Sequence, residues 1–97
     1  MRVRYSPRAI GDLEGIADYL ATRSRQGMRA VESSIRATVA LLGEFPRSGR
    51  VLEQRPQVRV IPVARFPYLI FYTVTDGMVV ILHIRHGARR PIDPDEL

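Results

Sequence analysis

Apolar residues recur every three or four positions along the first half of the chain. The first stripe follows Ser6-Pro7 and predicts a helix over residues 7–23, because serine is a favoured N-cap and proline fits the first helical turn. A second stripe over residues 28–45 stops before Pro46 and predicts a second amphipathic helix. Two such helices joined by a short turn form a helical hairpin, whose apolar stripes must cover another surface.

From about residue 56 the period of the pattern changes to two. Residues 58–63, 68–74 and 78–85 then predict three strands, and the short connections between them predict an antiparallel meander. Apolar and basic residues also alternate over residues 1–5, which predicts a short first strand. The order β-α-α-β-β-β predicts an α+β fold, an antiparallel sheet with the helical hairpin packed on one face.

The length of the chain favours a single domain, which we expect over residues 1–91. Residues 92–97 form a short acidic tail with too few apolar groups to pack, and we expect this tail to be loose or disordered.

The charge of the chain is basic and unevenly distributed. All 15 basic residues are arginine, against 10 acidic residues, and three of these acids lie in residues 93–97. The folded body is therefore more basic than the net charge of +5, which favours an anionic partner, either nucleic acid or an acidic protein surface. The absence of cysteine excludes disulfides and cysteine-based zinc sites. Without a signal-peptide core or an apolar run of membrane length, we expect a cytoplasmic protein with no membrane partner.

Both histidines of the chain lie in one segment near its end, ILHIRHGARRP, residues 81–91. Because side chains alternate across a strand, His83 and His86 should face opposite sides of the sheet and cannot share one metal ion. We therefore expect no metal site, and nothing in the sequence indicates a cofactor.

The same alternation divides the last strand between two faces. It predicts that the helix-covered core receives Val80, Leu82 and Ile84. It predicts that the open face receives Ile81, His83 and Arg85. Large side chains on both faces of residues 68–74 make the open face more apolar than solvent favours. That face is either a docking surface for a partner or a half-exposed sheet face of the kind that small α+β domains often have.

The residues after the last strand leave several functions open. His86, just before Gly87, can act as an acid or base in RNA cleavage, but it can equally cap or pack the end of the strand. Arg89 and Arg90 can bind phosphate, pair with the acids of a partner, or form a solvated turn. The sequence contains no nucleophile motif, phosphate-binding glycine loop or paired-carboxylate motif.

Three segments, VRYSPRAIGDLEGIADYLA, VRVIPVARFPYLIFYTV and VVILHIRHGARRP, resemble the RelE/ParE superfamily of bacterial type II toxins. The resemblance covers most of residues 1–91 in the family's order. The ending HGARRP is similar to the ParE branch, which often closes with His-Gly-Ala-Arg and an acid, although Arg90 stands here in place of the acid. The resemblance implies a toxin neutralised by a ParD-like antitoxin that wraps around it. It also implies a heterotetramer or larger assembly that binds operator DNA only through the antitoxin.

The superfamily has two activities: RelE-like members cut mRNA on the ribosome, and ParE-like members poison DNA gyrase. Arg65 and Arg85 match basic positions of the ribonucleases, and His86 can replace their C-terminal tyrosine. Their lysines have no counterpart here, although Arg59 can supply charge. This incomplete set favours a gyrase-binding toxin without catalytic residues.

Two alternatives stay open: a ribosome-dependent mRNA endoribonuclease that uses Arg65, Arg85 and His86, and a member that only binds its antitoxin. The residues expected to bind partners are Arg59, Arg65, Tyr72, His83, Arg85, Arg89 and Arg90.

Overall fold

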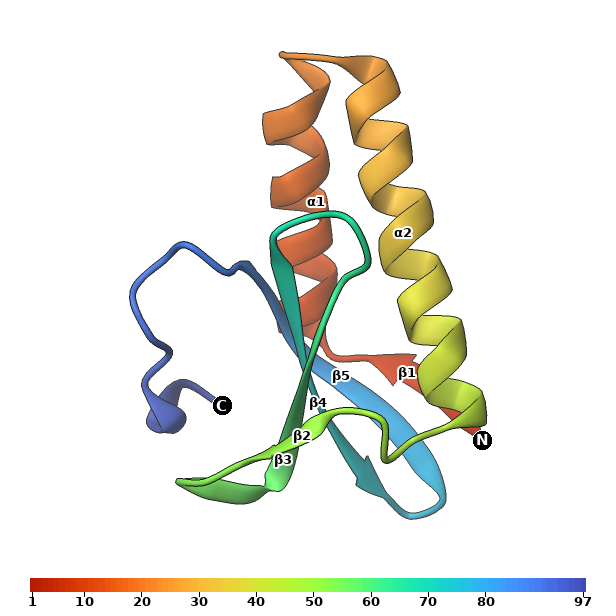
Figure 1. Cartoon of the computed structure of the whole chain (residues 1–97), viewed down its shortest axis with the longest axis vertical. Coiled ribbons are helices and arrows are strands. Elements are labelled where there is room, and N and C mark those ends of the chain that lie inside the picture. The colour runs from red at the N-terminus through yellow and green to blue at the C-terminus, as the bar shows by residue number, and fades with distance from the viewer.

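The computed structural model describes all residues from 1 to 97 and places two helices against one side of a five-stranded sheet (Figure 1). The helices are α1 (Pro7–Ala21) and α2 (Arg25–Glu44). The strands are β1 (Arg2–Tyr5), β2 (Arg50–Leu52), β3 (Arg55–Pro62), β4 (Tyr68–Thr75) and β5 (Met78–His86), and a 3-10 turn, η1, spans Pro94–Glu96. The strand order β1-β5-β4-β3-β2 confirms the predicted α+β fold with the helical hairpin on one face.

Two features of the sheet differ from the prediction. The sheet is mixed, because β1 pairs in parallel with β5, with Val3 opposite Val79. The helical hairpin and strands β2 to β4 all lie between β1 and β5 in the chain, which supplies the long connection that parallel pairing requires. The sheet also has an extra edge strand, β2, which pairs with β3. Its three residues are too few to give an alternating pattern.

Serine side chains begin both helices. The Ser6 hydroxyl accepts a hydrogen bond from the Ala9 amide (3.1 Å) and donates to the Leu82 carbonyl (3.0 Å), which joins the start of α1 to β5. Ser24 accepts from the Gly27 amide (2.9 Å), so α2 begins inside the stretch that we expected to form the break between the helices. Neither helix combines the length and hydropathy that a membrane span requires.

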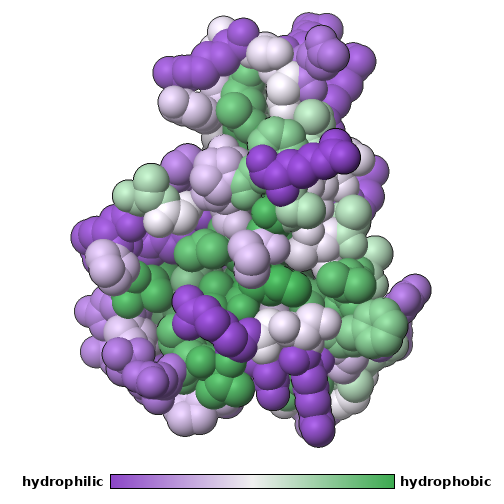
Figure 2. Space-filling view, viewed as in Figure 1, coloured by the Kyte–Doolittle hydropathy of each residue, from purple (hydrophilic) through white to green (hydrophobic).

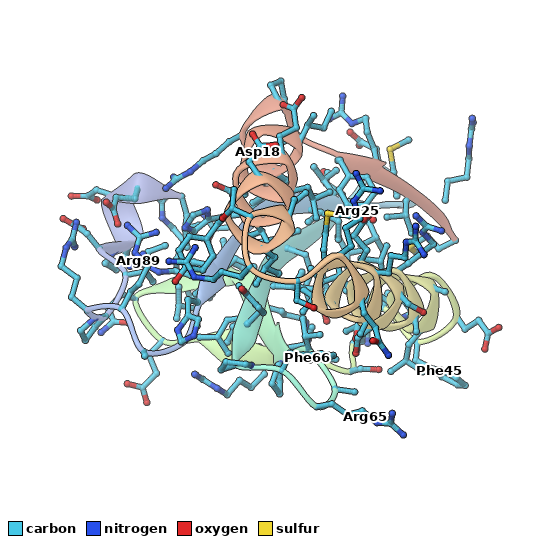
Figure 3. All side chains as sticks on the ribbon, turned by 90° about the horizontal axis from the view of Figure 1, so that it is seen from above. Asp18, Arg25, Phe45, Arg65, Phe66 and Arg89 are labelled. Atoms are coloured by element: carbon cyan, nitrogen blue, oxygen red, sulfur yellow. The ribbon has the colours of Figure 1, made fainter.

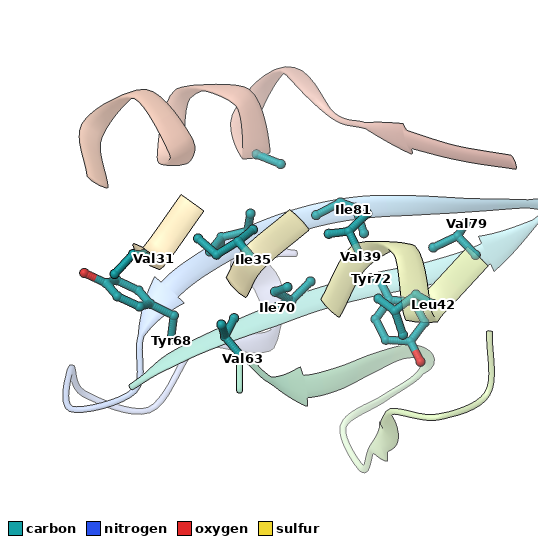
Figure 4. Packing of buried hydrophobic residues seen from close by; sticks show 12 residues of the cluster. Val31, Ile35, Val39, Leu42, Val63, Tyr68, Ile70, Tyr72, Val79 and Ile81 are labelled. Carbon is teal, nitrogen blue, oxygen red and sulfur yellow. The ribbon is translucent and has the colours of Figure 1, made fainter. Parts of the chain in front are cut away.

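The main core lies between α2 and the sheet, where apolar side chains from both layers interdigitate (Figure 4). Its fully buried members include Leu42, Ile70, Tyr72 and Ile81. The Tyr72 hydroxyl donates to the Pro46 carbonyl (2.8 Å) and accepts from the Gly49 amide (2.8 Å). Glycine is required at position 49, because an added Cβ would lie 2.7 Å from the Tyr72 ring.

A β-bulge in β5 changes the predicted alternation. Phe71 pairs with His83 while Tyr72 pairs with Ile81, so Leu82 is an extra residue without a partner. For the residues up to the bulge, the prediction was therefore wrong. Ile81 faces the helices, whereas Val80 and Leu82 face away from them. After the bulge it is correct: Ile84 lies in the main core, and His83 and Arg85 share the face of Phe71 and Leu69.

A second, smaller cluster lies on the side of the sheet away from the helices, which we call the outer face. It is built on Val58, Val60 and Phe71. The tail, residues 92–97, turns back from the end of β5 onto this face (Figure 1) and packs Ile92 and Leu97 against the cluster. In this structure the tail packs through two apolar anchors and contains a capped 3-10 turn.

Candidate functional site

His83 joins α1 to β5 through Asp12. The Asp12 Oδ2 accepts hydrogen bonds from His83 Nδ1 (2.6 Å) and from the Ile84 amide (2.9 Å). Both residues follow Ile81, the last residue of β5 that pairs with β1, so the edge of β5 is open to α1 there. Since Nδ1 carries the donated proton, the other ring nitrogen, Nε2, accepts from Arg8 Nη2 at 3.4 Å. Burial lowers the pKa of His83, the hydrogen bond that His83 donates to Asp12 opposes this, and the Arg8 guanidinium lowers the pKa further. His83 is therefore buried and already engaged with α1 on both ring nitrogens in the isolated chain.

Arg85 is also buried, with 4% of its surface exposed. Its Nη2 donates to the Arg90 carbonyl (3.0 Å), and its Nη1 lies 3.8 Å from the Glu96 carboxylate. Burial lowers the pKa of Arg85, but a guanidinium stays charged at neutral pH. The charge of Arg85 is thus already compensated by the C-terminal segment of its own chain.

His86 lies on the opposite face from His83, as strand alternation predicted. Its Nδ1 accepts from the Ala88 amide (3.0 Å), and its ring stands edge-on to Tyr68 at 5.4 Å between centroids. A cavity of about 490 Å³ between α1 and the end of β5 is lined by His86 and Tyr68 together with Tyr19, Arg85 and Arg89. This cavity combines aromatic rings with positive charge, although Asp12 also lines it.

The remaining residues expected to bind partners lie in separate places. Tyr72 is fully buried and is not available at the surface. Arg59 is half-buried, and its Nη1 donates to the Gly49 carbonyl (2.7 Å) in the loop after α2. Arg65 is exposed in the turn between β3 and β4, far from Arg89 on the other side of the molecule (Figure 3).

Arg90 is exposed and pairs with the Glu96 carboxylate at 3.3 Å. The expected set is therefore divided among the core, the outer face, the β3–β4 turn and the segment after β5. Only Arg85 and Arg89 line the same cavity.

Sequence reasoning missed the acidic partners of the site. Asp12 was not among the predicted site residues, although Arg8 and Asp12 are four residues apart and therefore lie on one side of α1. It also treated Glu96 as part of a loose tail, whereas this carboxylate contacts both Arg85 and Arg90. The spacing of Arg8 and Asp12 was a usable signal in the sequence, but no sequence pattern indicated the contacts of Glu96.

The surface also has an apolar groove between the two helices. This groove, of about 290 Å³, is lined mainly by apolar residues of α1 and α2, among them Leu13, Ile16, Leu20 and Met28. Figure 2 shows that apolar surface gathers over the sheet and the adjoining part of the helices, and that hydrophilic side chains surround it. The molecule thus presents apolar surface well suited to contact another protein.

The fold is that of small bacterial toxins from toxin–antitoxin systems. The structure is similar to one described as the chromosomal ParDE TA system from P. aeruginosa, with a TM-score of 0.75 and 23% identity over 89% of this chain and 95% of that one. It also resembles the isolated E. coli RelE toxin, with a TM-score of 0.63 and 15% identity over 91% of this chain and 85% of that one. A chain of the intact E. coli RelBE toxin–antitoxin complex is similar to the same degree, with a TM-score of 0.63 and 15% identity over 91% of this chain and 98% of that one.

The sequence itself defines the family. Residues 3–91 match the family described as the ParE toxin of the type II toxin–antitoxin system, parDE. A relative named Toxin RelE2, from Caulobacter vibrioides, is 34% identical over 89 residues, which cover 91% of this chain and 97% of the relative. The chain belongs to the ParE toxin family of type II toxin–antitoxin systems.

Proposed function

We propose that this toxin inhibits DNA gyrase by binding to it, without cleaving RNA, and that a ParD-like antitoxin neutralises it. The observation that carries this proposal is the separation of the residues that a ribonuclease would use. The β3–β4 turn adjoins the end of β5, where Tyr68 pairs with His86, but the exposed Arg65 side chain points outward (Figure 3) and does not line the cavity that Arg85 and His86 share. Stabilising a phosphorane-like transition state requires positive groups gathered around one phosphate.

The state of Arg85 and His86 also supports a binding role. Arg85 already contacts the Arg90 carbonyl and the Glu96 carboxylate, so its guanidinium is not free to meet a phosphate. His86 Nδ1 accepts from the Ala88 amide, which leaves only Nε2 for proton transfer. These contacts favour the capping role for His86 over the role of general acid or base.

The outer face and the groove between the helices support an antitoxin partner. Both surfaces are apolar, and arginine surrounds the outer face, which suits an acidic segment that wraps around the toxin. We further propose that the two proteins form a heterotetramer or a larger assembly that reaches operator DNA only through the antitoxin, in the cytoplasm.

The experiment for this proposal measures gyrase cleavage complexes on plasmid DNA with the purified toxin. We expect such complexes to accumulate, and equimolar antitoxin to abolish them. Substituting the exposed Arg89 and Arg90 together by alanine should weaken the effect, whereas the control Arg29→Ala, an exposed arginine of α2, should leave it unchanged. If the level of gyrase cleavage complexes stays unchanged when folded toxin is added, the gyrase proposal is refuted.

A second candidate function, ribosome-dependent mRNA cleavage, is favoured by one observation. Arg85, His86 and Arg89 line one cavity with Tyr19 and Tyr68, so that cations, an imidazole and aromatic rings meet there. Cleavage of ribosome-bound mRNA that is lost in both His86→Ala and Arg65→Ala would establish this function instead.

A further inference from the structure

Tyr68 supplies an unpaired hydroxyl to the cavity between α1 and the end of β5. The residue is only 8% exposed, and its hydroxyl points away from the other core side chains (Figure 4). Every fully enclosed side-chain nitrogen or oxygen of the chain has a hydrogen-bond partner, so the unpaired Tyr68 hydroxyl is open to the cavity. The hydroxyl of the other core tyrosine, Tyr72, is instead bonded inside the fold. Burial raises the pKa of Tyr68, so its hydroxyl is protonated at neutral pH and can donate to a ligand.

Bare helix backbone forms another side of this cavity. Gly11 and Gly15 of α1 line it, and a Cβ added at either position would meet no other atom within 4 Å. Neither glycine has a positive φ, so neither backbone strain nor close packing requires glycine there. An interior glycine weakens a helix relative to alanine. The two glycines therefore keep the cavity open at the expense of α1.

Further polar groups lie along the edge of β5 that extends beyond its pairing with β1. Asp12 uses Oδ2 for both of its hydrogen bonds, which leaves Oδ1 as an acceptor beside Ile84. His86 accepts from the Ala88 amide at Nδ1, so Nε2 of the neutral ring carries the proton and can donate. Arg89 adds a guanidinium that takes part in none of the salt bridges of the chain.

These groups are arranged in order along the cavity. Asp12 and Tyr19 are seven residues apart on α1, which is roughly 10 Å at a rise of 1.5 Å per residue. Asp12 lies beside Ile84 at one end, and Arg89, whose amide donates to the His86 carbonyl, lies toward the other. The volume of about 490 Å³ is typical of small-molecule sites. Aromatic rings between a hydrogen-bond acceptor and a cation suit a planar ligand that carries an amino group and an anion.

We propose that this cavity binds a purine nucleoside monophosphate whose base carries an amino group. The base stacks on the rings of Tyr19, Tyr68 and His86. The amino group donates to Asp12 Oδ1, and the phosphate pairs with Arg89, far enough from the Asp12 carboxylate to limit repulsion. Binding is reversible and breaks no bond. The proposal is independent of the cellular target, because it follows from the lining of the cavity alone.

The test titrates the full chain with adenosine 5′-monophosphate, AMP, and follows the ¹⁵N chemical shifts of the Gly15, Ile84 and Arg89 amides. We expect AMP to shift these amides at sub-millimolar concentration. Adenosine, which lacks the phosphate, and ribose 5-phosphate, which lacks the base, should each bind at least ~10-fold more weakly, because each loses one end of the site. The 5′-phosphorylated dinucleotide pApA distinguishes the source of the ligand. Tighter binding than AMP assigns the site to the end of a nucleic-acid strand, and weaker binding assigns it to a free nucleotide.

Two variants separate binding from folding. Gly15→Leu fills the cavity from α1 and should lower AMP affinity at least ~10-fold, while the urea midpoint rises because leucine is the better helix former. Arg89→Gln should lower AMP affinity by a similar factor. Its matched control, Arg25→Gln, removes the same charge from an exposed arginine that does not line the cavity (Figure 3), and affinity should stay at the wild-type value.

Three outcomes overturn the proposal. The first is the absence of shifts at the cavity amides at millimolar AMP. The second is AMP affinity in Gly15→Leu equal to that of the wild type. The third is equal affinity of AMP and ribose 5-phosphate with equal losses in Arg89→Gln and Arg25→Gln, which indicates attraction of phosphate to a basic surface only. Gyrase and antitoxin take no part in this experiment, so its failure leaves the proposed function to its own assay.

Discussion

The Asp12 carboxylate is the contact whose removal tests the site geometry most sharply. Asp12→Ala removes the acceptor of two hydrogen bonds, from His83 Nδ1 and from the Ile84 amide. His83 is almost fully buried, so its N–H cannot recruit water freely once the carboxylate is gone. The substitution therefore leaves two donors without partners at the junction of α1 and β5.

The size of the effect follows from the burial of these groups. Leaving a buried donor unsatisfied costs ~1–3 kcal/mol, and two donors set an upper bound of ~6 kcal/mol. Asp12 itself is 21% exposed, so water can replace part of what is lost. We therefore expect the free energy of unfolding to fall by ~2–4 kcal/mol, a large share of the ~5–15 kcal/mol that a small domain has.

Urea denaturation followed by circular dichroism measures this loss, with an unchanged m-value as evidence that the denatured state is comparable. Glu14→Ala is the control, because Glu14 is an exposed acid of the same helix without a hydrogen-bond partner, and it should change stability by at most ~0.5 kcal/mol. A loss for Asp12→Ala no larger than that of the control would refute the role assigned to the Asp12–His83 contact.

Three further predictions concern other contacts. Burial lowers the pKa of His83 below 6.5, so the unfolded chain binds more protons as the pH drops from about 6.5 toward the folded pKa. The free energy of unfolding should therefore fall through that window, and His83→Gln should flatten the dependence in urea titrations at several pH values. Tyr72→Phe removes the partner of two internal backbone groups and should cost ~1–3 kcal/mol in urea denaturation, whereas the exposed Tyr19→Phe should cost nothing measurable. Arg90→Asp, which places a second carboxylate beside Glu96, should repel Glu96 and speed hydrogen exchange of the tail amides several-fold; unchanged exchange would contradict the pairing.

Much of the fold could be predicted from the sequence, because long elements repeat their pattern many times. The apolar stripes of α1 and α2 were sufficient to predict both helices, and Ser6 marked the start of α1, but the cap at Ser24 was missed and α2 begins before residue 28. The three residues of β2 are too few to repeat a pattern. The parallel pairing of β1 depends on β5, which is distant in the sequence. The bulge at Leu82 could not be predicted, because alternation in sequence contains no mark of an inserted residue.

The candidate site was less predictable, for a physical reason. Residue types indicate which chemistry is available, but contacts over long sequence separations decide whether a side chain is free. Tyr72 was predicted to bind a partner, but its hydroxyl bonds to the Pro46 carbonyl and the Gly49 amide inside the fold. Arg85 looked like an exposed cation, and its partner Glu96 lies in the segment we expected to be loose.

The measurement that tests the central proposal most directly is gyrase-catalysed supercoiling of relaxed plasmid, titrated with antitoxin-free toxin alongside a ribosome-bound mRNA in the same buffer. We predict that supercoiling is lost as toxin reaches a small molar excess over gyrase, that antitoxin restores it, and that the mRNA stays intact. Full supercoiling at high toxin excess, with the mRNA cut, would contradict a toxin that acts by binding gyrase.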